Sequence, residues 1–211
     1  MLEVVNLECI RGDRRLFSEL SFDLSAGELL HLHGHNGSGK TTLLRTICGL
    51  ITPTEGEVRW QGENVRRLRD VFARELVYIG HKNAIKADLT GTENLRIACQ
   101  LDGIPVSEKQ AWDALEQLGL RGHEDLPVRV LSQGQKKRVA LARLLLNKSP
   151  LWILDEPFTA LDKAAVGYLQ TVIQAHVDAG GMVMLTTHQE VALTRGQVKQ
   201  LGLGWKRDGD V

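Results

Sequence analysis

The fold of this chain is decided by the stretch Gly34-His35-Asn36-Gly37-Ser38-Gly39-Lys40-Thr41-Thr42. The stretch fits the pattern G-x-x-x-x-G-K-[ST] of a phosphate-binding loop. The apolar run 29–33 before it predicts a buried strand, and after it Leu43, Leu44 and Ile47 recur at helical spacing. Strand, glycine-rich loop and helix form the context that such a loop requires, so the sequence predicts a nucleoside triphosphate site here.

The residues of this loop have the properties that phosphate binding requires. Glycines let backbone N–H groups turn toward phosphate oxygens, and the N-terminus of the following helix adds partial positive charge. Lys40 is expected to reach the β- and γ-phosphates, and the Thr41 hydroxyl is expected to ligate Mg²⁺. The predicted contacts to ATP come from the whole loop: Gly34, His35, Asn36, Gly37, Ser38, Gly39, Lys40, Thr41 and Thr42.

The composition of the 211 residues argues against several classes of protein. Lys plus Arg and Asp plus Glu number 26 each, so no basic field favours nucleic acid, and an aromatic content of 5% argues against a surface that stacks RNA bases. Cys9, Cys48 and Cys99 lack metal or redox spacing, and their odd number favours a reducing compartment. No signal peptide and no apolar run of about 20 residues is evident, so we expect any membrane role to run through a partner.

Short apolar runs alternate with amphipathic stretches along most of the chain. A helical insertion at about 82–146, with capping boxes at 90–93 and 107–110, interrupts this alternation. The pattern predicts one α/β domain, 1–211, in which helices cover both faces of a parallel sheet. The expected strands are 2–7, 16–24, an edge strand at 57–60, 76–79, 151–155 and 182–186, and the expected helices are 90–101, 107–119, about 133–146 and 163–179.

A second nucleotide-binding signal is the stretch Leu151-Trp152-Ile153-Leu154-Asp155-Glu156-Pro157. An apolar strand that ends in two carboxylates delivers negative charge to the open end of a parallel sheet, where ligands bind. Asp155 is suited to hold Mg²⁺, and Glu156 is suited to polarise the attacking water. Because adjacent side chains of a strand point apart, the two carboxylates are expected to occupy different positions.

A third signal is the stretch Leu131-Ser132-Gln133-Gly134-Gln135, which a basic helix follows. It resembles the L-S-G-G-Q signature of ATP-binding cassette (ABC) proteins, with Gln133 in place of the first glycine. In that family the signature docks on the γ-phosphate held by the opposite subunit, so a head-to-tail dimer encloses two ATP molecules. The resemblance implies that Ser132, Gly134 and Gln135 contact the ATP of a second copy of this chain.

Two further stretches are similar to parts of the same family. Phe158-Thr159-Ala160-Leu161-Asp162 resembles the D-loop. Met184-Leu185-Thr186-Thr187-His188 resembles the H-loop, whose histidine contacts the γ-phosphate. The resemblance implies a P-loop NTPase of the ABC type, with a parallel sheet core, an antiparallel β lobe and a helical subdomain.

The same resemblance implies ATP hydrolysis, a reaction that depends on positioning and charge neutralisation more than on covalent chemistry. The residues expected to be catalytic are Lys40, Glu156 and His188. Those expected to hold Mg²⁺ are Thr41 and Asp155.

The sequence departs from the family pattern at two positions. The family usually has an aromatic residue that stacks on adenine where this chain has Arg11. A guanidinium plane can also stack on a base, whereas the alternative, Phe17, reads better as a core residue. After the strand 76–79 the family normally places a glutamine that contacts Mg²⁺ or water, and this chain has His81, which offers one acceptor only when neutral.

The stretches 78–83, 85–86, 89–90 and 93–95, together with 151–162 and 185–189, closely resemble the CcmA family. This family supplies the ATP-binding subunit of the bacterial cytochrome c maturation system. The resemblance implies a peripheral subunit on the cytoplasmic face of the inner membrane. Two copies would pair with two multi-span CcmB-type subunits, near CcmC- and CcmD-type proteins, and ATP hydrolysis would drive haem export or release of a haem-loaded chaperone.

Other interpretations remain open at this stage. A cassette for copper-site assembly, drug export or lipid export would carry the same motifs with a different membrane subunit. A soluble cassette ATPase that acts on ribosomes or DNA is disfavoured by the single cassette and the balanced charge. His31, His33 and His35 alternate at the strand before the loop, and with no third ligand at metal spacing they favour packing over haem or metal binding.

Overall fold

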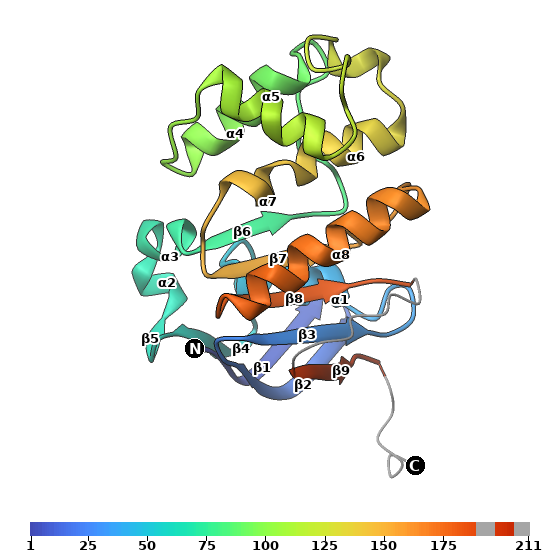
Figure 1. Cartoon of the computed structure of the whole chain (residues 1–211). Coiled ribbons are helices and arrows are strands. Elements are labelled where there is room, and N and C mark those ends of the chain that lie inside the picture. The colour runs from blue at the N-terminus through green and yellow to red at the C-terminus, as the bar shows by residue number, and fades with distance from the viewer. Residues whose placement is uncertain (189–196, 205–211) are drawn as a thin grey trace.

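The computed structural model describes residues 1–188 and 197–204, so Gln189, the last residue of the stretch 185–189, lies outside the described residues. Among the described residues, the largest sheet has five strands, and every neighbouring pair in it is parallel (Figure 1). The predicted parallel α/β core is therefore confirmed. In spatial order its strands are β6 (Leu76–Ile79), β7 (Leu151–Asp155), β8 (Met182–Thr186), β3 (Glu28–His33) and β9 (Gln197–Gly202).

A second, antiparallel sheet has the spatial order β2 (Arg14–Leu24), β1 (Leu2–Arg11), β4 (Glu55–Trp60) and β5 (Glu63–Asn64). The prediction of an edge strand at 57–60 is wrong, because β4 lies between β1 and β5. The stretch Gln61-Gly62 is the reason. Its φ angles of 52° and 84° form a two-residue hairpin turn, so the chain doubles back and pairs Trp60 with Glu63.

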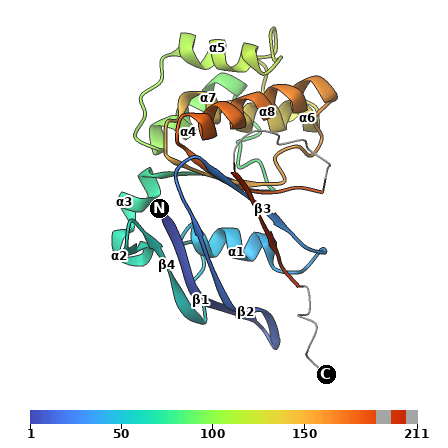
Figure 2. The ribbon, with the colours of Figure 1, turned by 60° about the horizontal axis from the view of Figure 1, so that its bottom comes forward.

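Helices cover both faces of the parallel sheet. α1 (Lys40–Ile47) packs with one core cluster, which includes alternate β7 residues Leu151 and Ile153. α8 (Lys163–Asp178) packs with the other cluster, which takes Trp152 and Leu154 from the same strand. Successive side chains of a strand point to opposite faces, so the fully buried run of β7 serves two cores at once. Figure 2 shows α1 on the side of the antiparallel sheet and α8 on the opposite side.

The remaining large helices gather at one end of the molecule (Figure 1). Each of the three longest begins at a capping box, in which a serine or threonine and a glutamate or glutamine three residues later exchange hydrogen bonds with the backbone. The boxes at 90–93 and 107–110 are thereby confirmed. These helices are α4 (Gly91–Leu101), α5 (Glu108–Gln117), α6 (Gln133–Leu141) and the short α7 (Arg143–Leu146).

The helix expected over 133–146 is broken into α6 and α7. The N–H of Leu145 donates to the carbonyl of Ala142 at 3.1 Å, three residues back, which is the tighter spacing of a 3₁₀ turn. The tighter turn rotates the residues that follow. Leu144 is consequently buried, whereas Leu146, at the end of the expected helix, is only half-buried.

Several short elements have no counterpart in the expectations from sequence: α2 (Val65–Leu68), α3 (Asp70–Arg74), a 3₁₀ turn at Val128–Val130 and the edge strand β9. The strand β9 pairs with β3 from Glu28↔Gln197 to His33↔Gly202. Its branched apolar residues are Val198 and Leu201. Within residues 1–188 and 197–204, no helix is both long enough and apolar enough to cross a membrane.

Candidate functional site

The phosphate-binding loop runs from the end of β3 into the first turn of α1. Gly34 has a φ of 153°, and a Cβ there would lie 2.5 Å from the carbonyl oxygen of Leu203. Gly39, the residue before α1, has a φ of 102°, and a Cβ there would lie 3.2 Å from the Cβ of Leu16. Both the positive φ angles and the close neighbours require glycine, which keeps the loop backbone open to a ligand.

Two polar side chains of this loop are placed for an anion. The Nζ of Lys40 donates hydrogen bonds to the carbonyl oxygens of Gly34 at 2.6 Å and His35 at 3.2 Å, so its ammonium lies across the loop. The hydroxyl of Ser38 is buried and has no hydrogen-bond partner among the described residues. A buried hydroxyl without a partner is costly, and a phosphate oxygen would satisfy it.

Asp155, the last residue of β7, is held in place by two hydroxyl groups. Its carboxylate is 2% exposed and accepts hydrogen bonds from Thr41 Oγ1 and Thr186 Oγ1, both at 2.8 Å. The strands β3, β7 and β8 are parallel, so their carboxyl ends meet at one edge and bring these three residues together. Hydroxyl and carboxylate oxygens form the hard donor set that Mg²⁺ prefers, and Thr41 and Asp155 therefore fit this ion.

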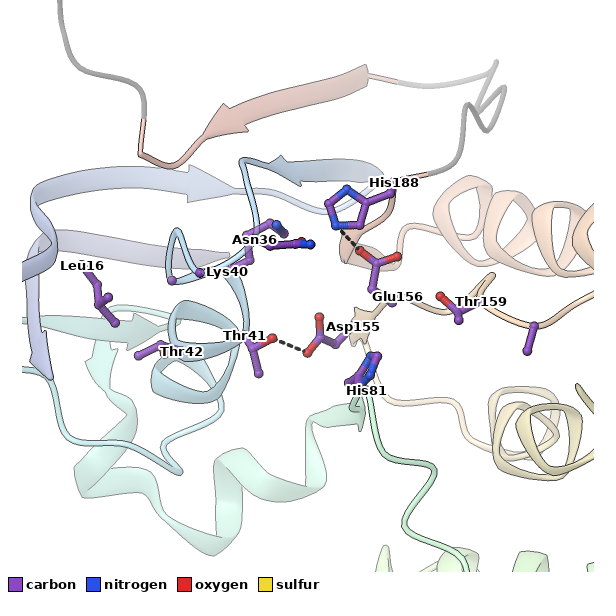
Figure 3. A pocket seen from close by; sticks show the side chains of 13 residues that line it. Leu16, Asn36, Lys40, Thr41, Thr42, His81, Asp155, Glu156, Thr159 and His188 are labelled. Carbon is purple, nitrogen blue, oxygen red and sulfur yellow. Dashed lines mark hydrogen bonds and ion pairs between the residues drawn. The ribbon is translucent and has the colours of Figure 1, made fainter. Parts of the chain in front are cut away.

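Glu156 follows with a φ of 51°, in the left-handed region that a non-glycine residue seldom adopts. Its N–H donates to Thr186 Oγ1 at 2.9 Å, which fixes the backbone in this conformation. The side chain turns away from that of Asp155, and its Oε1 lies 3.4 Å from His188 Nε2. The two carboxylates thus occupy different positions, and Glu156 faces the cavity beside the histidine (Figure 3).

These groups border one cavity of about 620 Å³ (Figure 3). The cavity brings together residues from five separate segments of the chain. Four of them lie at the carboxyl ends of the parallel strands β3, β6, β7 and β8, and the fifth is Leu16 of the antiparallel sheet. The residues of the sequence-predicted site that line it are Asn36, Gly37, Gly39, Lys40, Thr41, Thr42, His81, Asp155, Glu156 and His188.

Four contributors to this region were missed from sequence. Leu16 of β2 lines the cavity, as do Thr159 and Ala160 beyond Glu156. The Thr186 hydroxyl donates a hydrogen bond to the Asp155 carboxylate and accepts one from the backbone N–H of Glu156. One signal in the sequence could have identified Thr186. It is a threonine at the end of an apolar strand, directly before Thr187 and His188.

The two candidates for stacking on a base lie outside the lining of this cavity. Arg11 is exposed at the tip of the β1–β2 hairpin, where its backbone lies opposite that of Arg14 in the strand register. Phe17 is 8% exposed within the cluster that contains α1, which confirms its reading as a core residue. Leu16, its neighbour on the opposite face of β2, offers the cavity an apolar surface instead.

The signature stretch forms the N-terminus of α6. The N–H of Gln135 donates to Ser132 Oγ at 3.2 Å, and Gln135 Oε1 accepts from the N–H of Ser132 at 2.8 Å. Gly134 packs against the loop after β7, since a Cβ there would lie 2.6 Å from the carbonyl oxygen of Ala160. None of these three signature residues lines the cavity of its own chain.

We expect Gly134→Ala to destabilise the fold by about 1–3 kcal/mol, because the added methyl group displaces the Ala160 carbonyl or the first turn of α6. The matched control is Gly167→Ala in α8, where a Cβ meets nothing within 4 Å. That variant should gain about 0.5–1 kcal/mol from the better helix propensity of alanine. Chemical denaturation of both variants measures the two changes, and equal stabilities would contradict the close packing at Gly134.

We expect Thr186→Val to cost about 1–3 kcal/mol of stability, because it removes a hydrogen bond from the buried Asp155 carboxylate without changing the side-chain volume much. The variant also frees the N–H of Glu156, so the rate of ATP hydrolysis should fall. The control is Thr171→Val on the exposed side of α8, which removes a hydroxyl that donates to the carbonyl oxygen of Tyr168, three residues back. Wild-type stability and turnover in Thr186→Val would show that the hydroxyl positions neither group.

The histidines of β3 do not complete a metal site in the part of the chain that the structure describes. The rings of His31 and His33 lie 5.8 Å apart and are tilted by 57°. His31 is half-buried in β3, and this burial lowers the pKa of its imidazole because it disfavours the charged form. Across residues 1–188 and 197–204, no three His, Cys, Asp or Glu side chains gather in a way that could hold a metal ion.

Comparison with known proteins agrees with this geometry. Residues 17–159 match the family described as ABC transporter. The chain is 56% identical to the "Cytochrome c biogenesis ATP-binding export protein CcmA" of Dechloromonas aromatica, over 97% of this chain and 100% of that protein. It is 54% identical to the protein of the same name from Nitrosomonas europaea, over 96% and 95% of the two chains.

Solved structures show the same fold. An ABC transporter ATP-binding protein from Pyrococcus furiosus superposes with a TM-score of 0.81, 25% identity and coverage of 96% of both chains. The ABC transporter cassette MJ0796, solved as a dimer, superposes with a TM-score of 0.83, 25% identity and coverage of 96% of this chain and 94% of that one.

Proposed function

Because the chain belongs to the ABC transporter family, and within it to the ATP-binding export proteins of cytochrome c biogenesis called CcmA, we propose that it hydrolyses ATP for an export complex that matures c-type cytochromes. One observation carries the chemical part of this proposal. Five segments far apart in sequence meet in one cavity that holds a phosphate-binding loop, a carboxylate pair and His188. The role in cytochrome c maturation is supported by 56% and 54% identity with two CcmA proteins, over 97% and 96% of this chain.

The residues of the cavity divide the work of phosphoryl transfer to water. Lys40 stabilises the β- and γ-phosphates, and the backbone N–H groups of the loop bind their oxygens. Thr41 and Asp155 would hold Mg²⁺, and the ion would neutralise charge on the phosphates. Glu156 accepts a hydrogen bond from the attacking water and orients it, while His188, 3.4 Å from the Glu156 carboxylate, contacts the γ-phosphate.

The ATP site is completed by a second copy of the chain in a head-to-tail dimer. Ser132, Gly134 and Gln135 form a helix N-terminus that does not line the cavity of their own chain. A helix N-terminus binds anions well, so these residues are suited to the γ-phosphate in the partner's cavity. The dimeric state of the MJ0796 cassette, a relative in fold and family, supports this arrangement.

A membrane subunit of the CcmB type, with CcmC- and CcmD-type proteins nearby, is the proposed partner at the cytoplasmic face of the bacterial inner membrane. Haem or a haem-loaded chaperone is the proposed cargo of the complex. The names of the relatives, which describe export proteins, support a membrane partner. So does an apolar pair one turn apart on α4, since Ile97 is 47% exposed and Leu101 is 84% exposed.

The partner is tested by purifying the tagged chain from detergent-solubilised membranes and identifying co-purified proteins by mass spectrometry. We expect a c-type cytochrome assembly protein, and we expect Leu101→Asp to reduce its recovery. The control is Leu50→Asp, a leucine 64% exposed beyond the end of α1. Recovery of the membrane subunit of a drug, lipid or copper-site assembly system would instead establish that alternative.

A further inference from the structure

A second positive side chain lies beside the phosphate-binding loop, on the strand that carries Leu16. A Cβ built at Gly37, in the middle of the loop, would lie 3.8 Å from Nη1 of Arg14, and Gly37 itself lines the cavity. Arg11, which lies opposite Arg14 in the strand register, has no atom within 4 Å of the same point. Of these two arginines at the tip of the β1–β2 hairpin, Arg14 is therefore the one placed against Gly37.

The strand β2 directs Arg14 toward the side of the cavity. Arg14 and Leu16 are two residues apart, so their side chains share one face of β2, and Leu16 lines the cavity. Arg15, between them, extends from the opposite face and forms an ion pair, with 3.0 Å between its Nε and Glu8 Oε1. The alternation of the strand thus separates two adjacent arginines, one that faces the loop and one that faces away from it.

The surroundings of Arg14 hold positive charge without an anion to balance it. Within residues 1–188 and 197–204, Arg14 makes neither an ion pair nor a side-chain hydrogen bond, even with the adjacent Asp13. Its partner in the register is Arg11, and like charges directly opposite each other destabilise an antiparallel pair. The loop, 34–42, adds Lys40 and contains no carboxylate. An anion bound at the loop would relieve this accumulation of positive charge.

The position of Leu16 indicates which end of a nucleotide Arg14 would meet. Figure 3 shows Leu16 on the side of the loop away from Asp155 and Glu156. Under the proposed function the γ-phosphate lies beside these two carboxylates, so the α-phosphate and the nucleoside extend toward Leu16 and Arg14. A guanidinium at that end can donate two parallel hydrogen bonds to phosphate oxygens.

We propose that Arg14 is a substrate-binding residue that contacts the α-phosphate end of the nucleotide. The inference rests on the proposed function. Lys40 and Arg14 then contact the two ends of one phosphate chain, with Lys40 at the β- and γ-phosphates. The Arg14 contact stabilises bound ATP and bound ADP equally, because both carry the α-phosphate. It also stabilises the ground state and the transition state of hydrolysis equally, because the reacting γ-phosphate lies at the other end of the chain.

The test is Arg14→Gln, which removes the charge and keeps an exposed polar side chain. We expect the Kd values for MgATP and for ADP, measured by isothermal titration, to rise by the same factor of roughly fivefold to twentyfold. We expect kcat at saturating MgATP to stay within about twofold of wild type, because uniform binding is lost. Arg14→Lys, which keeps the charge without the planar fork, should bind both nucleotides more tightly than Arg14→Gln and less tightly than wild type.

The matched control is Arg15→Gln, which makes the same change of charge one residue away, on the opposite face of β2. Its affinity for both nucleotides should stay within about twofold of wild type. Wild-type affinity in Arg14→Gln, an equal loss in Arg15→Gln, or a loss for MgATP without a loss for ADP would each overturn the inference. Failure of the wild-type protein to bind MgATP would refute the proposed function itself, so the two failures are distinguishable.

Discussion

Glu156→Gln is expected to lower the rate of ATP hydrolysis by about 10²–10⁴-fold while ATP still binds. The amide keeps the shape of the side chain but no longer orients and polarises water as a carboxylate does. The loop residues and the Thr41–Asp155 hydrogen bond that build the phosphate site are untouched. Phosphate release under single-turnover conditions measures the rate, and a fluorescent ATP analogue measures the affinity.

The control for this variant is Glu108→Gln, which changes an exposed glutamate in the first turn of α5, far along the chain from the cavity. It should hydrolyse ATP at the wild-type rate. Turnover of Glu156→Gln within about twofold of wild type would remove Glu156 from its role as the group that activates water, and the strained φ of 51° would then need another explanation.

Lys40→Ala is expected to weaken ATP binding by about 100-fold or more, because an ammonium bonded to two carbonyl groups of the loop supplies the main positive charge at the phosphates. Isothermal titration with MgATP measures the loss. The matched control is Lys109→Ala, which removes an exposed lysine whose ion pair with Asp113 lies on the surface. A surface pair of this kind contributes about 0–1 kcal/mol, so affinity and stability should both stay near wild type.

Wild-type affinity in Lys40→Ala would place the nucleotide elsewhere. A loss of affinity accompanied by unfolding would leave the phosphate contact unproven, so the melting temperature is measured on the same sample. We expect it to change little in the nucleotide-free protein, because Lys40 is only part-buried and its two acceptors are backbone carbonyls near solvent.

The parts of the site that could be predicted are those that local sequence encodes. The phosphate-binding loop and the Asp155-Glu156 pair each need only a strand and the residues directly after it, and both strands formed as expected. The capping boxes of α4 and α5 are equally local, because each joins residues three apart.

The parts that sequence did not reveal depend on pairing between distant segments. Thr186 bonds Asp155 because β8 happens to lie beside β7 in register, and the neighbours of a strand are not written in its own residues. Leu16 reaches the cavity because the antiparallel sheet packs with α1 in one core cluster. The strand β9 was missed for the same reason, because it forms by pairing with the distant strand β3, from Glu28↔Gln197 to His33↔Gly202.

Local patterns also misled in two places, for reasons visible in the backbone. The stretch 57–60 was interpreted as an edge strand, yet Gln61 and Gly62, with φ angles of 52° and 84°, form a hairpin turn that pairs it with β5. The helical spacing from Gln133 to Leu146 predicted one helix, and a single 3₁₀ hydrogen bond from Leu145 to Ala142 divides it. The spacing of apolar residues at a period of 3.6 does not show where a hydrogen bond changes from four residues back to three.

We propose that two chains share each ATP through Ser132 and Gly134. Light scattering of Glu156→Gln with and without MgATP tests it most directly, since the variant keeps ATP without cleaving it. We predict the mass of one chain without nucleotide and twice that mass with MgATP, and we predict that Glu156→Gln combined with Ser132→Arg stays at one chain in both. The mass of a single chain for Glu156→Gln at saturating MgATP would contradict the account.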